Sequence, residues 1–157
     1  MFSNTLFTDA KTQEELFAEV AKHLVSVDYV TPDYGQALLE REKVFPTGLK
    51  VDLKDGSELL YAAIPHTETQ FCLVDQVVYV KNSQPITFQH MINLEEKCLV
   101  PHCFFIINSR ANSQTEILSN LITFFITKGN LAHLSQLGKN EEAISSFLKE
   151  KGVFQND

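Results

Sequence analysis

The segment Cys98–Ile107 constrains the fold more than any other part of this 157-residue sequence. Nearly all of its residues are apolar, and His102 is the main exception. A strand that is apolar on both faces has to be covered on both faces, which is typical of central strands in α/β proteins. Glu58–Ala63 and the valine-rich Phe71–Val80 are further strand-like stretches. We therefore expect a sheet with helices on both sides.

Helical periodicity with start and stop signals predicts five helices. Two of them open with a capping box, formed by Thr12 with Glu15 and by Ser113 with Glu116. The remaining helices are predicted to begin at Thr31, which is followed by a proline, at Leu131, and after Asn140 as a cap.

Turn residues predict loops at Pro46–Gly48 and at Ser83–Pro85. No repeat or linker divides the chain, so residues 1–157 are predicted to form a single domain. The order of helices, strands and helices, with central strands apolar on both faces, predicts a three-layer α/β/α sandwich.

The composition excludes several classes of function. A formal charge of −7 and a pI near 5.2 disfavour binding to nucleic acid or to an anionic membrane surface. The N-terminus lacks the pattern of a signal peptide, and the longest apolar stretches are too short to span a bilayer. Three cysteines without CxxC spacing are interpreted as reduced, buried thiols, so we expect a cytoplasmic protein.

His66 is the first candidate for a functional residue. It follows the strand-like Leu60–Ile64 and comes directly after Pro65, which places it on a stiff segment where a strand leaves the sheet. A neutral imidazole there has a nitrogen lone pair for nucleophilic attack. On position alone, however, a structural or turn histidine is the more common case.

Arg41 is the second candidate, since a guanidinium close to His66 would neutralise phosphoryl oxygens. Its surroundings of alternating charge also fit an ordinary exposed arginine. A metal site at His102 and Cys103 is disfavoured, because neighbouring residues in a strand point to opposite faces. His23, His90 and His133 are interpreted as solvated surface residues.

The segment from Ala37 to Thr67 contains ALLEREKVFPTGL and then AAIPHTE. It resembles the enzyme IIA domains of the fructose/mannitol class (type 2) of the bacterial sugar phosphotransferase system. The phenylalanine-proline-threonine-glycine run is most similar to galactitol-type IIA proteins. By length and order of elements the resemblance covers essentially the whole chain, and its specific part is this block of about thirty residues.

The resemblance implies a three-layer sandwich around a mixed central sheet and a phosphotransferase activity. It places the phosphorylated histidine, modified at Nε2, on His66 and the family's arginine on Arg41. The donor would be the phosphohistidine carrier HPr and the acceptor a cysteine of a IIB protein, which serves a membrane-embedded IIC permease. No cofactor or metal is implied.

Mannitol-type members carry a second active-site histidine, and Gln114 stands about where that residue would be. Its amide is expected to donate a hydrogen bond to a phosphoryl oxygen but supplies no charge. Because both partners are proteins, we expect a shallow, exposed site with small, transient interfaces. The docking residues are predicted to be Phe45, Thr47, Gly48, Leu49 and Ile64.

Two readings of the function stay open at this point. The first is a transport phosphocarrier for galactitol or a related polyol. The second is a regulatory IIA-like phosphoprotein that controls transcription or transport by docking to partners. A IIA domain does not contact the sugar, so the sequence does not fix the cargo, and it does not fix the oligomeric state either.

Overall fold

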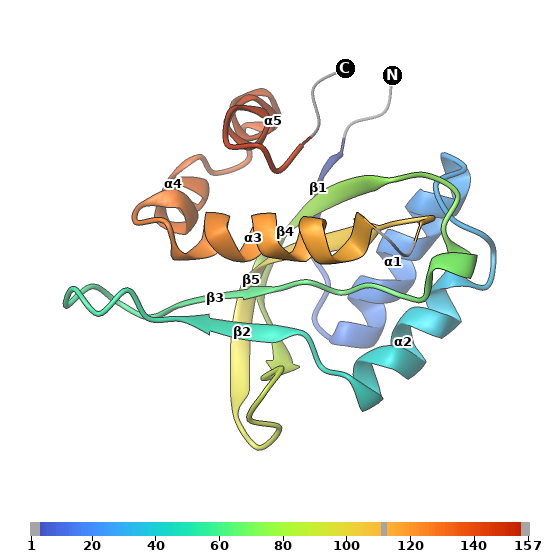
Figure 1. Cartoon of the computed structure of the whole chain (residues 1–157), viewed down its shortest axis with the longest axis horizontal. Helices are drawn as coiled ribbons and strands as arrows, with labels where there is room; N and C mark the ends of the chain where they lie inside the picture. The colour runs from blue at the N-terminus through green and yellow to red at the C-terminus, as the bar shows by residue number, and fades with distance from the viewer. Residues whose placement is uncertain (1–3, 111–112, 155–157) are drawn as a thin grey trace.

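The structure is a computed structural model that describes residues 4–110 and 113–154. Five strands form one sheet in the order β1-β4-β5-β3-β2 (Figure 1). The strands are β1 (Thr5–Thr8), β2 (Gly48–Val51), β3 (Leu60–Ala63), β4 (Gln76–Gln89) and β5 (Lys97–Ile107). β1 runs parallel to β4 and β3 parallel to β5, whereas the other two pairs are antiparallel. The expected mixed sheet is confirmed.

Helices cover both faces of this sheet (Figure 1). The helices are α1 (Gln13–Ser26), α2 (Tyr34–Val44), α3 (Gln114–Ile126), α4 (Asn130–Gln136) and α5 (Glu141–Glu150), with a 3-10 turn η1 (Thr69–Phe71) after β3. α1 and α2 bury their apolar residues in one core, and α3, α4 and α5 bury theirs in another. The three-layer α/β/α sandwich is therefore confirmed.

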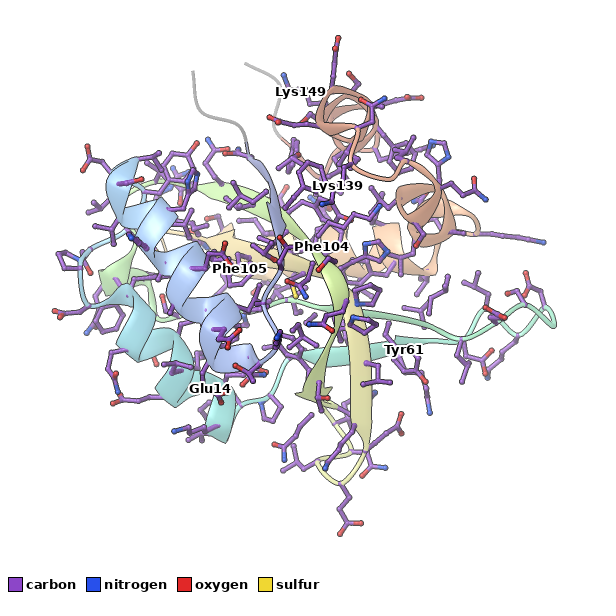
Figure 2. The ribbon with its side chains drawn as sticks, turned by 180° about the vertical axis from the view of Figure 1, so that it is seen from behind. Glu14, Tyr61, Phe104, Phe105, Lys139 and Lys149 are labelled. Atoms are coloured by element: carbon purple, nitrogen blue, oxygen red, sulfur yellow. The ribbon has the colours of Figure 1, made fainter. Side chains whose placement is uncertain are left out.

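The central strand β5 shows why two cores form. Phe104 and Phe105 are sequence neighbours labelled in Figure 2, and they belong to different cores because successive side chains of a strand point to opposite faces. Phe105 packs edge-on against Phe17 of α1, with ring centroids 5.8 Å apart. The ring centroid of Phe104 lies 5.1 Å from that of Phe125 of α3. The apolar run that predicted burial on both faces is the part of the chain that holds the layers together.

Two of the predicted helix caps are confirmed. The Oγ1 of Thr12 accepts the N–H of Glu15 at 3.1 Å, and the side chain of Asn140 accepts the N–H of Ala143 at 3.0 Å. The start of α2 was predicted too early: it begins at Tyr34, beyond Thr31, and it extends to Val44. At α3, Ser113 is the N-cap residue but its side chain caps no backbone N–H.

The strand predictions were incomplete. Neither β1 nor β2 was predicted, because each has only four residues and is stabilised mainly by pairing with a neighbouring strand, β4 for β1 and β3 for β2. The predicted loop at Ser83–Pro85 lies inside β4, where the pairing with β5 shifts between Lys81 and Ile86. Proline is tolerated at such an irregularity.

Among the described residues, no helix is long and apolar enough to cross a membrane. All three cysteines are free and buried, as expected.

Candidate functional site

His66 follows β3 after Ile64 and Pro65, and its backbone is held against the central strand. It forms a parallel bridge with Ile106 of β5, whose N–H donates to the Pro65 carbonyl at 3.1 Å. Proline cannot donate to the ladder, so β3 ends here while the chain remains attached to the sheet. His66 is only 9% exposed. The site is more enclosed than the shallow, exposed one we expected.

The imidazole of His66 is oriented by one hydrogen bond. Its Nδ1 lies 2.8 Å from the Ile64 carbonyl oxygen, which can only accept, so Nδ1 carries the proton and Nε2 keeps its lone pair. Among the described residues, no group forms a hydrogen bond with Nε2. Burial lowers the pKa of His66 and the Arg41 cation lowers it further, while the Ile64 carbonyl and Glu68 act in the opposite direction. The ring is therefore neutral near pH 7.

Arg41 lies near the end of α2 and lines the same hollow as His66. Its Nη1 is 3.2 Å from Oε1 of Glu68, and its guanidinium lies over the Phe45 ring at 5.1 Å from the centroid. Its Nε–H is buried and has no hydrogen-bond partner among the described residues. The structure thus places a guanidinium cation at the hollow that His66 also lines.

The hollow has a volume of about 430 Å³ and a predominantly apolar rim. Val44, Phe45, Ile92 and Leu94 are large apolar side chains of the rim that are exposed to solvent. The lining is completed by Arg41, Pro46, Thr47, His66, Met91 and Leu118. His90 shapes the loop between β4 and β5, because its Nδ1 accepts the N–H groups of Ile92 and Asn93 at 3.1 Å. A small polar centre is thus surrounded by exposed apolar groups from α2 and from this loop.

Of the five predicted docking residues, Phe45 is the one that is exposed on the rim. Ile64 is fully buried in the core of α3, α4 and α5, so its side chain cannot dock a partner, and its contribution to the site is its carbonyl group. Leu49 is half-buried against the same core. The prediction placed these two side chains on the surface because it did not include strand β2. It also did not establish which face of the sheet the side chains at the end of β3 lie on.

Thr47 and Gly48 are buried, and they stabilise the backbone conformation at the site. Thr47 lines the hollow, and its N–H and hydroxyl group both donate to the carboxylate of Glu42. A Cβ added to Gly48 would lie 2.6 Å from the Gln89 carbonyl oxygen, closer than such contacts occur. The turn between α2 and β2 therefore needs a glycine so that it can approach the end of β4.

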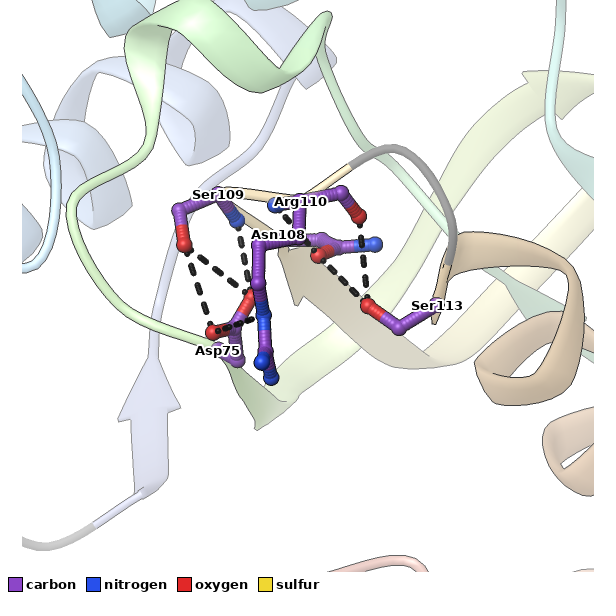
Figure 3. Close-up of polar contacts among 5 residues, drawn as sticks. All are labelled: Asp75, Asn108, Ser109, Arg110 and Ser113. Atoms are coloured by element: carbon purple, nitrogen blue, oxygen red, sulfur yellow. Dashed lines mark hydrogen bonds and ion pairs between the residues drawn. The ribbon is translucent and has the colours of Figure 1, made fainter.

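Asn108, Ser109, Arg110 and Ser113, which lie between β5 and α3, form a polar network with Asp75 (Figure 3). Asp75 accepts hydrogen bonds from the N–H and hydroxyl of Ser109 and pairs with Arg110 at 3.2 Å. The side-chain oxygen of Asn108 accepts the N–H of Arg110 and the hydroxyl of Ser113. This network positions the start of α3, where Gln114 is the first residue. Gln114 is half-buried and is not among the residues that line the hollow, whereas Leu118, one turn later, is.

The other histidines lie in different environments. His102 is 2% exposed and hydrogen-bonds Tyr79 and Ser135, so it is a core residue. His133 is exposed and contacts the Phe147 ring. Within residues 4–110 and 113–154, no cluster of three or more histidine, cysteine or acidic side chains is arranged to hold a metal ion.

Sequence reasoning missed Glu42, Glu68, Ile92 and Leu94. Glu42 and Glu68 are ordinary charged residues in the sequence, and only the fold brings them to Thr47 and to Arg41. Ile92 and Leu94 lie in a polar stretch without periodicity. Apolar residues in a loop are the signal that would have indicated them as an interaction surface.

The same fold occurs in solved IIA proteins. The crystal structure of IIA mannitol from Escherichia coli is 22% identical, with 92% of this chain and 95% of that chain covered and a TM-score of 0.67. The IIA in the E. coli complex of enzyme IIAMtl with phosphorylated enzyme IIBMtl is 21% identical, with 94% of each chain covered and a TM-score of 0.68. Nitrogen regulatory protein IIA-Ntr from Neisseria meningitidis is 19% identical, with 92% and 91% covered and a TM-score of 0.61. No curated protein sequence gives a significant match.

Residues 3–151 match the family described as phosphoenolpyruvate-dependent sugar phosphotransferase system, EIIA 2. The match spans nearly the whole chain, so the protein belongs to this family of phosphotransfer proteins. The predicted resemblance to type 2 IIA proteins is thereby confirmed.

Proposed function

We propose that this protein is the IIA phosphocarrier of a sugar phosphotransferase system in the cytoplasm, with His66 as the residue that carries the phosphoryl group. The observation that carries the proposal is the bond between Nδ1 of His66 and the Ile64 carbonyl. It commits the proton to Nδ1 and leaves Nε2 as the nucleophile. The donor is phosphorylated HPr, and the acceptor is a cysteine of the cognate IIB, which serves a IIC permease.

Each transfer exchanges one bond to phosphorus for another. The Nε2 lone pair of His66 attacks the phosphorus of phosphorylated HPr, and the phosphorus–nitrogen bond of the donor breaks. A cysteine thiolate of IIB then attacks the same phosphorus, and the bond to Nε2 breaks. Such transfer requires positioning and charge stabilisation and little other chemistry from the protein.

Arg41 supplies the cation of the proposed site. Its guanidinium lines the hollow together with His66, and phosphoryl oxygens are suitable acceptors for guanidinium N–H groups. Glu68 already holds Nη1, which restricts the guanidinium to one orientation. Gln114 begins α3 but does not line the hollow, so we assign it no part in the transfer.

The apolar rim provides the docking surface for both partners. Ile92 is 81% exposed, and Val44, Phe45 and Leu94 are each more than half exposed around the entrance to His66. Exposed apolar groups that surround a polar centre are typical of protein interfaces. HPr and IIB would use the same rim in turn, so neither complex can be permanent.

The test is phosphorylation with purified enzyme I and HPr. Wild-type protein should become labelled, and His66→Ala should lose all labelling while its circular dichroism spectrum is unchanged. Labelling of the variant would disprove the assignment of His66. Because His102 is buried in the core, His102→Gln should be labelled like the wild type.

A regulatory role is the second candidate, favoured by the structural similarity to the nitrogen regulatory protein of N. meningitidis. Challenge of the phosphorylated protein with the IIB encoded nearby separates the two roles. Rapid transfer to a IIB cysteine supports transport, for which we propose galactitol or a related polyol as cargo. Retention of the label in the presence of that IIB supports regulation.

A further inference from the structure

Glu42 is a buried acidic residue beneath the candidate site. It is 5% exposed, and burial raises the pKa of its carboxyl group to about 7 although two hydrogen bonds from Thr47 lower it. Within the described residues it forms no salt bridge: the neighbouring Arg41 pairs with Glu68. Burial of a carboxyl group without a paired cation is costly. A specific role would account for its presence.

The carboxylate of Glu42 holds the turn after α2 by two bonds. The backbone N–H of Thr47 donates to Oε2 at 2.7 Å, and the Thr47 hydroxyl group donates to Oε1 at 2.9 Å. On the other side of the turn, the Gly48 carbonyl accepts the N–H of Met91 at 2.8 Å. The backbone is thus held on both sides of the Thr47 carbonyl group.

Thr47 is connected to His66 through hydrogen bonds of main-chain groups. Its carbonyl accepts the N–H of Ile64 at 3.3 Å, and the Ile64 carbonyl accepts the Nδ1–H of His66 at 2.8 Å. The sequence of bonds therefore runs from the Glu42 carboxylate through Thr47 and Ile64 to the imidazole ring. Each group in it is buried, so water does not readily replace a lost partner.

We propose that Glu42 is a positioning residue that sets the tautomer and the orientation of His66 through Thr47 and Ile64. Loss of both carboxylate oxygens frees the Thr47 peptide, weakens the contact with Ile64, and lets the Ile64 carbonyl move away from Nδ1. The imidazole then gains the alternative tautomer, with the proton on Nε2, in which the nucleophilic lone pair is lost. The consequence for phosphoryl transfer rests on the function proposed above, whereas the effect on the tautomer does not.

Two variants weaken this sequence of bonds and three others serve as controls. Glu42→Met keeps the volume but removes both acceptors, whereas Thr47→Val removes the hydroxyl donor and leaves the bond from its backbone N–H. Glu42→Gln retains an acceptor for the Thr47 N–H, while its amide group can donate to the hydroxyl oxygen, so it should restore the bonds. Thr47→Ser keeps the hydroxyl group. Glu40→Met makes the same substitution at an exposed position of α2, where Glu40 accepts a bond from Gln36.

The first measurement is the pair of imidazole ¹⁵N chemical shifts of His66 in the unphosphorylated, folded protein, identified by comparison with His66→Ala. Wild type, Glu42→Gln, Thr47→Ser and Glu40→Met should show the tautomer protonated at Nδ1. Glu42→Met should show averaged shifts as the second tautomer becomes populated, and Thr47→Val should show a smaller change in the same direction because one bond to Glu42 remains. A role limited to stability would lower the unfolding free energy and leave these shifts unchanged.

The second measurement is the rate of labelling by phosphorylated HPr. Glu42→Met should lower kcat about 10- to 100-fold and leave KM unchanged, since small displacements of reacting groups have effects of this size while the docking rim is intact. Wild-type shifts and kcat in Glu42→Met overturn the proposal. If that variant does not fold, Thr47→Val decides by the same criteria. Failure of wild-type protein to accept the label refutes the proposed function, and the chemical shifts then decide the role of Glu42.

Discussion

His102 should make the stability of this protein depend on pH in a way that one substitution can isolate. Its Nδ1 lies 2.6 Å from the Tyr79 hydroxyl group, and its Nε2 lies 3.0 Å from Oγ of Ser135. Burial, with a smaller contribution from the nearby Lys81 cation, lowers the pKa of His102 from 6.5 to about 3. The folded protein therefore holds a neutral imidazole at pH 5, whereas the unfolded chain holds a protonated one.

The magnitude follows from this difference in proton binding. A histidine whose folded pKa is depressed costs no stability above pH 6.5 and destabilises the fold progressively as the pH falls from 6.5 toward 3. Between pH 7.5 and pH 5.0 the loss is about 2 kcal/mol, taking an unfolded pKa of about 6.5. Glu42 acts in the opposite direction, because its raised pKa lets the folded protein take up a proton over the same range.

The assay is urea unfolding of wild-type protein and of His102→Gln at both pH values. Glutamine can accept from Tyr79 and donate to Ser135, but it does not titrate. The contribution of Glu42 is present in both proteins and cancels in the comparison. On acidification the wild type should lose about 2 kcal/mol more than the variant. Equal losses would refute the idea that a buried, neutral His102 governs this pH dependence.

Three further predictions concern the candidate site. Arg41→Gln should slow labelling by phosphorylated HPr about 10- to 1,000-fold, as does loss of a donor that stabilises developing charge, and Arg41→Lys should recover part of the rate; an unchanged rate would make Arg41 an ordinary surface residue. Ile92→Asp should raise KM at least about 10-fold without a change in the melting temperature, since the side chain is 81% exposed. Its control is Leu99→Asp, at an exposed position that does not line the hollow; if the two variants have the same KM, Ile92 is not a docking residue. Gly48→Ala should destabilise the fold by about 1–3 kcal/mol in urea unfolding, because its Cβ would press on the Gln89 carbonyl, and wild-type stability would show that the turn can move away.

The layers of the fold could be predicted because their signals are local and strong. The apolar run of β5 and the capping residues Thr12 and Asn140 specify their elements within a few residues of sequence. β1 and β2 could not be found in this way. Thr5–Thr8 becomes a strand by pairing with Tyr79–Asn82, more than seventy residues later in the chain. Such a strand is stabilised by pairing and packing with its neighbour, so its own residues show no clear strand pattern.

The site was predictable where chemistry follows from residue type. The imidazole of His66 and the guanidinium of Arg41 are recognisable in the sequence, and the fold places both in one hollow. The surroundings were not predictable, because they depend on which way each side chain faces. Ile64 was predicted to dock partners and is instead buried, since the alternation of β3 directs it into a core. Two of the exposed apolar groups, Ile92 and Leu94, come from a loop between β4 and β5 whose course no local pattern reveals.

The bonds that hold His66 in place also bear on how sequences in this family can diverge. Three successive contacts, from Thr47 to Ile64, from Ile64 to the imidazole and from Ile106 to Pro65, use main-chain carbonyl groups as acceptors. A carbonyl group is supplied by every amino acid, so a substitution at Ile64 leaves the acceptor for Nδ1 in place as long as the backbone keeps its path. The position of the histidine therefore depends mainly on the course of the backbone. The side chains of the rim can change to suit a different partner without moving it.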